Sequence, residues 1–447
     1  EAVWVWWVLC IIIVILTKNI TQQNERKEIT MSEKDYLDGL RQSSRRRKSR
    51  AGKITEQVKS EVEAELNKEL GSTGEETESA SIADDREKKS PREGVIFQDV
   101  TTKDIQVELV YYPRLNYALV HNKIPLIHSL KIRNHSVETG ENGLVKCWVA
   151  PDYGEPWQVT FSSIPTGEEQ TIEEIHIPLD KNRLMEVTEA EKASLRVEVY
   201  IDDKLVHSNT FPIEVLAYNE WFFHPELLFL IASFVFPNDQ AVEETINAAR
   251  DFLVDLTGND SFSGYQEDKE KVRYMIESIY QTIQEDLDLS YINPPASFES
   301  TGQKIFTPSQ ILKHRRGTCL DLSLFYAAIL ERIGLHPLIL LVPGHALLGC
   351  WMRGSEIPDN AVIEDMQMID KLDILWINST TFTDSDNDFE TAVEDARKIL
   401  SECNALEEMV DIDEPEDEDP EITERTFTVQ AIDIFTARGM GAKPLPL

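Results

Sequence analysis

The sequence is poor in cysteine and in positive charge, and both shortages exclude classes of protein. Its 447 residues contain five cysteines, with no CxxC pair and no Cys/His cluster at zinc-ligand spacing. We therefore expect a reducing compartment and neither a disulfide framework nor a structural metal site. Lysine and arginine number 44 against 80 acidic residues, a formal net charge of −36. Non-specific nucleic-acid binding needs a basic face, so we expect no direct nucleic-acid binding.

A phosphate loop of the form GxxxxGK[ST] is also missing, so this chain by itself is not predicted to be an ATPase. No motif implies a metal or an organic cofactor. The charge is uneven: residues 41–53 are strongly basic, whereas residues 61–93 and 411–424 are acidic. Acidic runs of this kind are typical of solvated, disordered segments.

An apolar run without charged residues lies at the start of the sequence. Residues 2–17 (AVWVWWVLCIIIVILT) are apolar and include three tryptophans, which suit a membrane interface. The basic residues follow this run, and no small-residue cleavage site does, which favours an anchor over a signal peptide. We predict a transmembrane anchor at residues 1–18 and a charged, partly helical tether at 19–93. The protein is then a single-pass cell-membrane protein with its later domains in the cytoplasm.

Short β-like runs separated by turn signals fill residues 94–217. Apolar residues alternate in IQVELVYY, IPLIHSLKI, GLVKCWVA and WQVTFSSI, and residues 195–216 have the pattern of a hairpin turned at Asp202 and Asp203. This spacing predicts an antiparallel β-sandwich of immunoglobulin or fibronectin type.

Helical periodicity takes over in residues 218–400, which we assign to a second, α+β domain. Helices are expected at 226–236, 239–256, 269–287, 307–314 and from Cys319 to about Gly334. Apolar strands are expected at 338–342, 345–352 and 373–380. Residues 401–447 then form an acidic linker and C-terminal extension.

The candidate chemistry lies in residues 307–351, where Cys319 opens a helix and His345 opens a strand. A helix N-terminus favours the thiolate form, so we expect a lowered pKa for Cys319. His345, delivered by a neighbouring strand, is the candidate proton carrier. Asp321 is expected to cap the cysteine helix, and Cys147 and Cys350 are expected to be core residues.

Several motifs carry a family resemblance. GTCLD at 317–321 and GHA at 344–346 resemble the cysteine and histidine motifs of the transglutaminase-like superfamily, which belongs to the papain-like enzymes in the broad sense. AYNEW at 217–221, FVFPND at 234–239, GYQ at 264–266 and PPASFESTGQKIFTPSQIL at 294–312 resemble one bacterial family more closely. In that family a β-sandwich and a transglutaminase-like domain precede a superfamily 1 helicase. The likeness covers about residues 95–447, and the helicase is not in this chain.

The resemblance implies roles for individual residues. Cys319 is the nucleophile that forms an acyl-enzyme, and His345 takes the thiol proton and returns it to the leaving amine. The superfamily usually has an acid that orients the histidine, and Asn378 stands at the aligned position. Asp365, Asp373 and Asp433 are alternatives for this role. The Cys319 N–H is the expected oxyanion donor, with Gln303 as a second candidate.

Two functions follow from this resemblance. The first is a membrane-tethered cysteine peptidase or acyltransferase that acts on a protein or peptide. The second is an inactive transglutaminase-like scaffold that recruits a separately encoded helicase or nuclease, in defence against foreign DNA.

Overall fold

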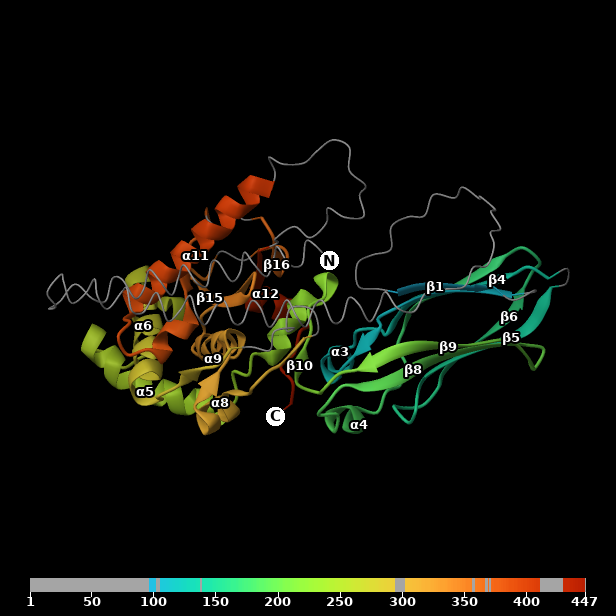
Figure 1. The fold of residues 1–447 in the computed structure, drawn as a ribbon, viewed down its shortest axis with the longest axis horizontal. Helices are drawn as coiled ribbons and strands as arrows, with labels where there is room; N and C mark the ends of the chain where they lie inside the picture. Colours follow the sequence, from blue (N-terminus) through green and yellow to red (C-terminus); the bar gives the residue numbers. More distant parts are fainter. Residues whose placement is uncertain are drawn as a thin grey trace, which may run out of the picture. The chain divides into compact units, whose positions relative to one another are not determined.

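A computed structural model describes most of the chain after residue 95. The described residues are 96–101, 105–136, 139–293, 302–355, 358–365, 369, 371–410 and 429–446, without the side chains of 96–101 and 405–410. The fold is mixed α+β, as predicted (Figure 1). The predicted anchor at 1–18 and tether at 19–93 lie outside the described residues. Among the helices that are described, none is long and apolar enough to cross a membrane.

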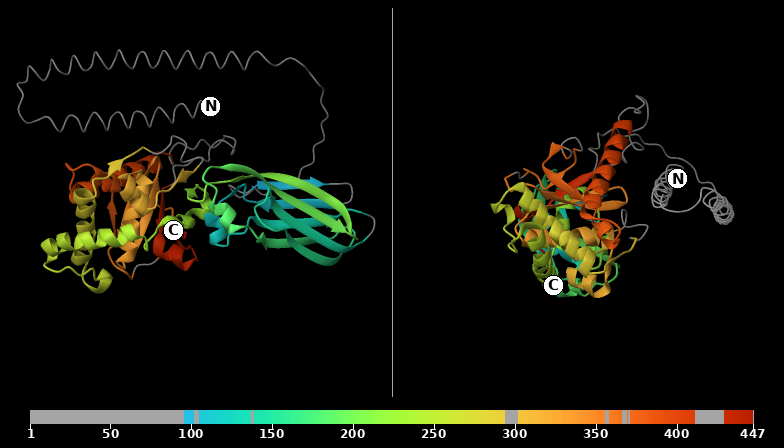
Figure 2. Two further views of the ribbon diagram at one scale, coloured as in Figure 1. Left: turned by 90° about the horizontal axis from the view of Figure 1, so that it is seen from below. Right: turned by 90° about the vertical axis from the view of Figure 1, so that its left-hand side faces the viewer.

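Residues 96–215 form two β-sheets (Figure 2). The first has the order β1-β2-β4-β7, with β1 Ile96–Thr101, β2 Ile105–Tyr111, β4 Ile127–Asn134 and β7 Glu169–Ile175. The second has the order β3-β9-β8-β5-β6, with β3 Arg114–Leu115, β9 Lys204–Val215, β8 Glu191–Ile201, β5 Gly140–Ala150 and β6 Trp157–Ile164. All pairs are antiparallel except β3 with β9.

Alternation of apolar side chains explains why these segments are strands. On β2 the residues at odd positions from Ile105 to Tyr111 are buried, and the intervening ones are half-buried. The inward side chains of both sheets belong to one hydrophobic cluster. The predicted hairpin is confirmed, because Asp202 and Asp203 take φ values of 49° and 59° in the two-residue turn between β8 and β9. Positive φ at both positions matches the twist of a tight hairpin.

Helices dominate residues 225–335, close to the predicted bounds. They are η1 Pro225–Phe234, α5 Gln240–Thr257, η2 Gly264–Gln266, α6 Lys269–Asp286, α8 Pro308–His314 and α9 Cys319–Arg332. Side-chain caps set several starts: Asp239 caps α5, Asp268 caps α6, and Thr307 caps α8. The helix predicted at 226–236 is found at this place, but it is a 3₁₀ helix and not an α-helix.

A five-stranded antiparallel sheet carries the candidate site. Its order is β16-β18-β14-β15-β17, with β16 Val362–Ile363, β18 Gln430–Asp433, β14 Pro337–Val342, β15 His345–Trp351 and β17 Ile374–Ile377. Helix α9 packs against residues of one face, including Ile339 and Leu348. Helix α11, Phe389–Val410, contributes Ala396 and Leu400 to the cluster on the other face. Both faces are therefore covered, and the strands are apolar almost throughout.

The end of the chain belongs to this fold. Strand β18 pairs with both β14 and β16, and the short helix α12, Ile434–Gly439, follows it. The predicted boundary at residue 400 is therefore wrong for residues 429–446, whose apolar segment QAID completes the sheet. Further on, Lys443 N–H donates to Asn122 Oδ1 across 2.7 Å, beside the short helix α3, Tyr117–His121. The other short helix of this region is α4, Lys181–Met185.

Candidate active site

A capping box fixes the start of the cysteine helix. Thr318 Oγ1 accepts from the Asp321 N–H at 3.2 Å, and Asp321 Oδ2 accepts from the Thr318 N–H at 3.0 Å. Asp321 Oδ1 also accepts from the Phe306 N–H at 2.8 Å. These bonds place Cys319 at the first position of α9 and confirm the predicted capping role of Asp321.

The Cys319 thiol is fully buried, with 0% of the residue exposed. Burial raises the pKa of Cys319 to about 11, although hydrogen bonds from the backbone of Ala346 and Leu320 lower it. The expectation of a lowered pKa is therefore wrong. The helix N-terminus does act on the sulfur in the expected direction, but the loss of water around the thiolate outweighs it. The resting group is a neutral thiol.

Tyr291 contacts the same sulfur from a different segment. It lies on β11, Ser290–Tyr291, which pairs in parallel with β13, Arg316–Gly317, and this pairing places Tyr291 opposite Gly317. A hydrogen bond joins its hydroxyl to the Cys319 sulfur and lowers the pKa of that thiol. Burial, together with Cys319, raises the pKa of Tyr291 itself. The phenol is thus a neutral donor to the thiolate whenever that forms.

His345 is delivered by a tight hairpin. It pairs with Val342 across β14 and β15, and Pro343 and Gly344 form the turn, with Gly344 at φ 71°. The residue after it, Ala346, provides the backbone hydrogen bond to the Cys319 sulfur. The structure therefore brings the cysteine helix and the histidine strand together, as the sequence predicts.

Asn378 completes the constellation at the end of β17. Its Oδ1 lies 3.0 Å from His345 Nε2 and also accepts from the Thr380 N–H at 3.2 Å and the Thr380 hydroxyl at 2.9 Å. The side chain caps η3, Ser379–Thr383, and only 4% of the residue is exposed. An amide oxygen only accepts, so His345 donates through Nε2 and its Nδ1 is left as the basic nitrogen.

The alternative acids have other partners. Asp433 Oδ2 accepts from Trp351 Nε1 at 2.6 Å while its Oδ1 caps α12, and Asp373 forms ion pairs with Lys269 and Arg353. Asp365 is exposed and follows β16, the edge strand at the opposite end of the sheet from β17. Of the four candidates, Asn378 is the one that contacts His345.

Gln303 lies directly behind the start of α9. It belongs to β12, Gln303–Lys304, which pairs with β10, Glu220–Trp221, and its Nε2 donates to Thr318 Oγ1 at 2.6 Å. The amide therefore supports the cap next to Cys319. The first N–H groups of a helix have no acceptor within it, which leaves the Cys319 N–H as the better oxyanion donor.

Three residues near the site were not identified from the sequence: Tyr291, Ser323 and Asp395. Ser323, one turn after Cys319, donates to Ala346 O at 3.3 Å and lies 3.3 Å from Ser379 Oγ. Asp395 Oδ2 accepts from Asn378 Nδ2 at 2.6 Å. A polar residue inside the apolar face of α9 was a signal for Ser323. No local pattern marks Tyr291 or Asp395, because tertiary packing alone brings them to the site.

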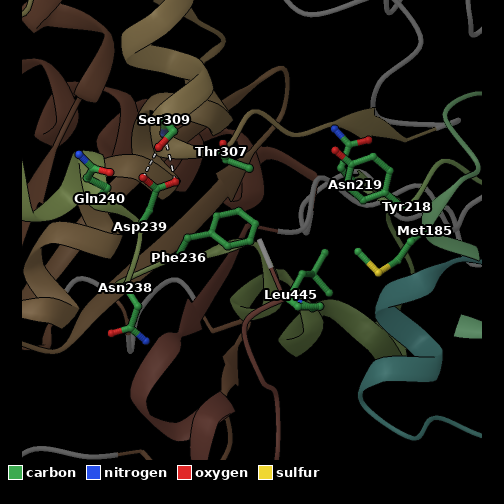
Figure 3. Close-up of a pocket in the computed structure, with 11 residues that line it drawn as sticks. Met185, Tyr218, Asn219, Phe236, Asn238, Asp239, Gln240, Thr307, Ser309 and Leu445 are labelled. Carbon is green, nitrogen blue, oxygen red and sulfur yellow. Dashed lines mark hydrogen bonds between the residues drawn. The ribbon is translucent and has the colours of Figure 1, made fainter. Parts of the chain in front are cut away.

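One cavity in the described part of the chain lies away from Cys319. It has a volume of about 600 Å³ and is lined by Met185, Tyr218, Asn219, Phe236, Asn238, Asp239, Gln240, Thr307, Ser309, Leu445 and Pro446 (Figure 3). Asp239 is its most buried polar residue, and it accepts from the Ala241 and Ser309 N–H groups at 2.8 and 3.2 Å. These bonds tie the starts of α5 and α8 together. No residue that lines the cavity belongs to the Cys319 constellation. In the described part of the chain, no cluster of three or more His, Cys, Asp or Glu residues has the arrangement of a metal site.

Comparisons with known proteins add little. No protein-family model matches the sequence, and no curated protein matches it. Among solved structures, the exo-chitosanase CsxA of Amycolatopsis orientalis matches with 10% identity and a TM-score of 0.17, over 53% of this chain and 30% of that protein. A likeness this weak carries no argument about fold or activity.

Proposed function

We propose that this chain is a cysteine-dependent amide hydrolase of transglutaminase-like type, acting on a protein or peptide. The observation that carries the proposal is the hydrogen bond of 3.0 Å between His345 Nε2 and Asn378 Oδ1. It directs the basic Nδ1 away from Asn378, and Ala346, next in the chain, contacts the Cys319 sulfur. Nucleophile, base and orienting group then follow the order of a Cys-His-Asn triad.

The reaction starts from the neutral thiol. As the Cys319 sulfur attacks the carbonyl carbon, His345 Nδ1 takes the thiol proton and the Cys319 N–H donates to the developing oxyanion. The imidazolium returns the proton to the leaving amine, which departs and leaves a thioester. Water then attacks the thioester, His345 takes its proton and returns it to the sulfur, and a carboxylic acid is released. Hydrolysis is favoured over acyl transfer to an amine because water is always available to the acyl-enzyme.

The proposal extends to the architecture. The two sheets of residues 96–215 support an immunoglobulin-like sandwich at residues 94–217, and the order of helix α9, hairpin β14–β15 and strand β17 supports a transglutaminase-like domain from residue 218. That domain includes β18. The relation to the bacterial helicase-fusion proteins stays a proposal that rests on the sequence motifs.

The membrane anchor at residues 1–18 likewise rests on sequence. In the proposal it tethers the catalytic domain to the cytoplasmic face of the cell membrane. A reporter fused after Leu447 tests the orientation: a reporter active only in the cytoplasm is expected, and activity on the opposite side of the membrane would contradict it.

An activated acyl donor tests the chemistry without knowledge of the substrate. The full chain is treated with p-nitrophenyl acetate at pH 7.5, and the peptide that contains Cys319 is weighed by mass spectrometry. The proposal expects a burst of nitrophenol and one acetyl group on Cys319, and neither in Cys319→Ala. In His345→Ala the acetylation is expected to slow by a factor of about 100. Equal acetylation of Cys319 with and without His345 would refute the proposed function.

A second candidate is favoured by one observation. The Cys319 sulfur is fully buried and burial raises its pKa to about 11, which suits an inert core thiol. In that case the domain is a scaffold that recruits a separately encoded helicase or nuclease. A wild-type chain that forms no acyl-enzyme in the experiment above would favour the scaffold.

A further inference from the structure

The amide of Asn378 has a defined orientation in the structure. On its oxygen side lies the Thr380 N–H, which can only donate, at 3.2 Å. On its nitrogen side lies the Asp395 carboxylate, which accepts at 2.6 Å. A rotation by 180° would place the amide NH₂ against the Thr380 N–H and the amide oxygen against a carboxylate. Both contacts would be repulsive, so the observed orientation is strongly preferred.

This orientation decides which nitrogen of His345 carries the proton. With the Asn378 oxygen facing Nε2 at 3.0 Å, the neutral imidazole must carry its hydrogen on Nε2. With the amide rotated, NH₂ would face Nε2, and the proton would move to Nδ1. With a proton on Nδ1, this nitrogen could no longer accept the proton of the Cys319 thiol. Control of the amide is therefore control of the tautomer.

We propose that Asp395 is a positioning residue: it holds Asn378 in the orientation that places the His345 proton on Nε2. The role of the tautomer in catalysis rests on the proposed function, but the tautomer itself does not. Asp395 lies on α11, and its position is set by the packing of that helix on the sheet. The Asn378 N–H also donates to Ala392 O at 3.1 Å, so the backbone of α11 is tied to the same residue.

Asp395 allows an amide to take the place of the usual acid. An isolated asparagine can rotate, and each rotamer selects a different imidazole tautomer. The Thr380 N–H disfavours one of the two states, and the Asp395 carboxylate disfavours it more strongly, because its charge-assisted bond to the NH₂ group exists only in the other. Asp395 thereby restores the directional control that a carboxylate in contact with histidine would exert through its charge.

Substitutions of Asp395 test the inference in the full chain. Asp395→Ala removes the acceptor, whereas Asp395→Asn keeps an amide oxygen that accepts from Asn378 Nδ2. Glu394 is exposed on the same helix, so Glu394→Ala and Glu394→Gln are matched controls. Asp395→Ser, too short to reach Asn378, replaces the alanine variant if that variant does not fold by circular dichroism.

The first readout is the tautomer of His345. The nine histidines are labelled with ¹⁵N, and the His345 signals are assigned by their loss in His345→Ala. At pH 8.5, where an ordinary imidazole is neutral, the wild type is expected to show its proton on Nε2. Asp395→Asn and both Glu394 variants should keep that pattern, and Asp395→Ala should show the Nδ1–H tautomer or a mixture. An unchanged tautomer in Asp395→Ala, or a loss of equal size in Asp395→Asn, would overturn the inference.

The second readout is the rate of Cys319 acetylation by p-nitrophenyl acetate. We expect it to fall about tenfold or more in Asp395→Ala and to stay within about threefold of wild type in Asp395→Asn. The two proposals fail differently. If Cys319 is acetylated in His345→Ala as fast as in wild type, the proposed function is wrong. The measured tautomer of His345 in Asp395→Ala then still decides whether Asp395 positions Asn378. If His345→Ala is slow and Asp395→Ala is as fast as wild type, the inference on Asp395 alone fails.

Discussion

His345 Nε2 lies 3.0 Å from Asn378 Oδ1, so the group that orients this histidine is an amide and not an acid. The amide orients the imidazole but brings no charge to stabilise the imidazolium that forms during attack. A carboxylate, Asp395, lies one side chain further on and accepts from Asn378 Nδ2 at 2.6 Å. The site thus combines a histidine held by a neutral group with a thiol that is neutral at rest.

Asn378→Asp should destabilise the protein in a pH-dependent manner. The new carboxylate would face Asp395, and two carboxylates in contact raise the pKa of one of them. A raised folded-state pKa makes the folded form bind more protons, so the destabilisation is small near pH 4 and grows as the pH rises. We expect a loss of about 1–3 kcal/mol at pH 8, measured by urea unfolding at pH 4.5 and 8.

The double variant Asn378→Asp with Asp395→Asn is the control for this experiment. It restores an amide-to-carboxylate bond with the two groups exchanged, and it should recover most of the lost stability. A double variant as unstable as the single one would show that Asn378 and Asp395 do not act as a pair.

Tyr291→Phe should slow the reaction of Cys319 without opening the site. The ring keeps its size, but the hydroxyl that donates to the sulfur is lost, and the pKa of Cys319 is expected to rise. We expect iodoacetamide labelling at pH 8 to slow about three- to tenfold. Tyr274→Phe, which removes a hydroxyl bonded to Glu270 on the exposed side of α6, is the matched control. Faster labelling in Tyr291→Phe would mean that the tyrosine acts mainly as a cover.

Asp321→Ala should be among the most destabilising single substitutions in the domain. Asp321 is 2% exposed and accepts from the Phe306 and Thr318 N–H groups at 2.8 and 3.0 Å. Its loss leaves the Thr318 N–H and hydroxyl before α9, and the Phe306 N–H before α8, without this acceptor, at a cost of about 3–4 kcal/mol. The free energy of urea unfolding measures this, with Asp251→Ala on the exposed face of α5 as the control. A change below about 1 kcal/mol would contradict the assigned role of the capping box.

The raised pKa of Cys319 predicts how Cys319→Ala changes the free energy of unfolding at alkaline pH. An ordinary thiol has a pKa of about 8.5, and the folded-state value is about 11. Between these values the folded state binds more protons, so the wild type loses stability as the pH rises. Cys319→Ala lacks this loss. The stability advantage of wild type over Cys319→Ala should shrink by about 1 kcal/mol per pH unit from pH 8.5 to 11.

The comparison is clean because Cys147 and Cys350, whose pKa values burial raises to about 12, are present in both chains. A difference in unfolding free energy that stays constant from pH 8 to 11 would contradict the raised pKa of Cys319.

The order of elements around the site could be predicted from the sequence, because local signals are strong there. Thr307 followed by Pro308, and Thr318 three residues before Asp321, mark helix starts, and both are capping boxes in the structure. The turn at Pro343 and Gly344 predicted the hairpin that delivers His345.

Other features depend on contacts between distant segments and carry no local pattern. The fully buried state of Cys319 follows from the packing of α9, β11 and β15 together, so the sequence predicted the wrong direction for its pKa. Asp395 comes seventeen residues after Asn378 in the chain, and it reaches Asn378 only because α11 packs on β17. Strand β18 is separated from its partners in sequence by an acidic run and was therefore assigned to an extension.

The pH dependence of Cys319 labelling tests the central claim most directly. The full chain is labelled with iodoacetamide from pH 7 to 9.5, and half-buried Cys403 on α11 is the reference thiol in the same molecule. If His345 Nδ1 takes the thiol proton, the wild-type rate at Cys319 should be nearly flat in this range, because an ordinary imidazole is already deprotonated. In His345→Ala the rate should be at least about tenfold lower at pH 7 and rise about tenfold per pH unit, as expected for a lone thiol with a pKa of about 11. The same steep rise in both chains would show that His345 is not the base for Cys319.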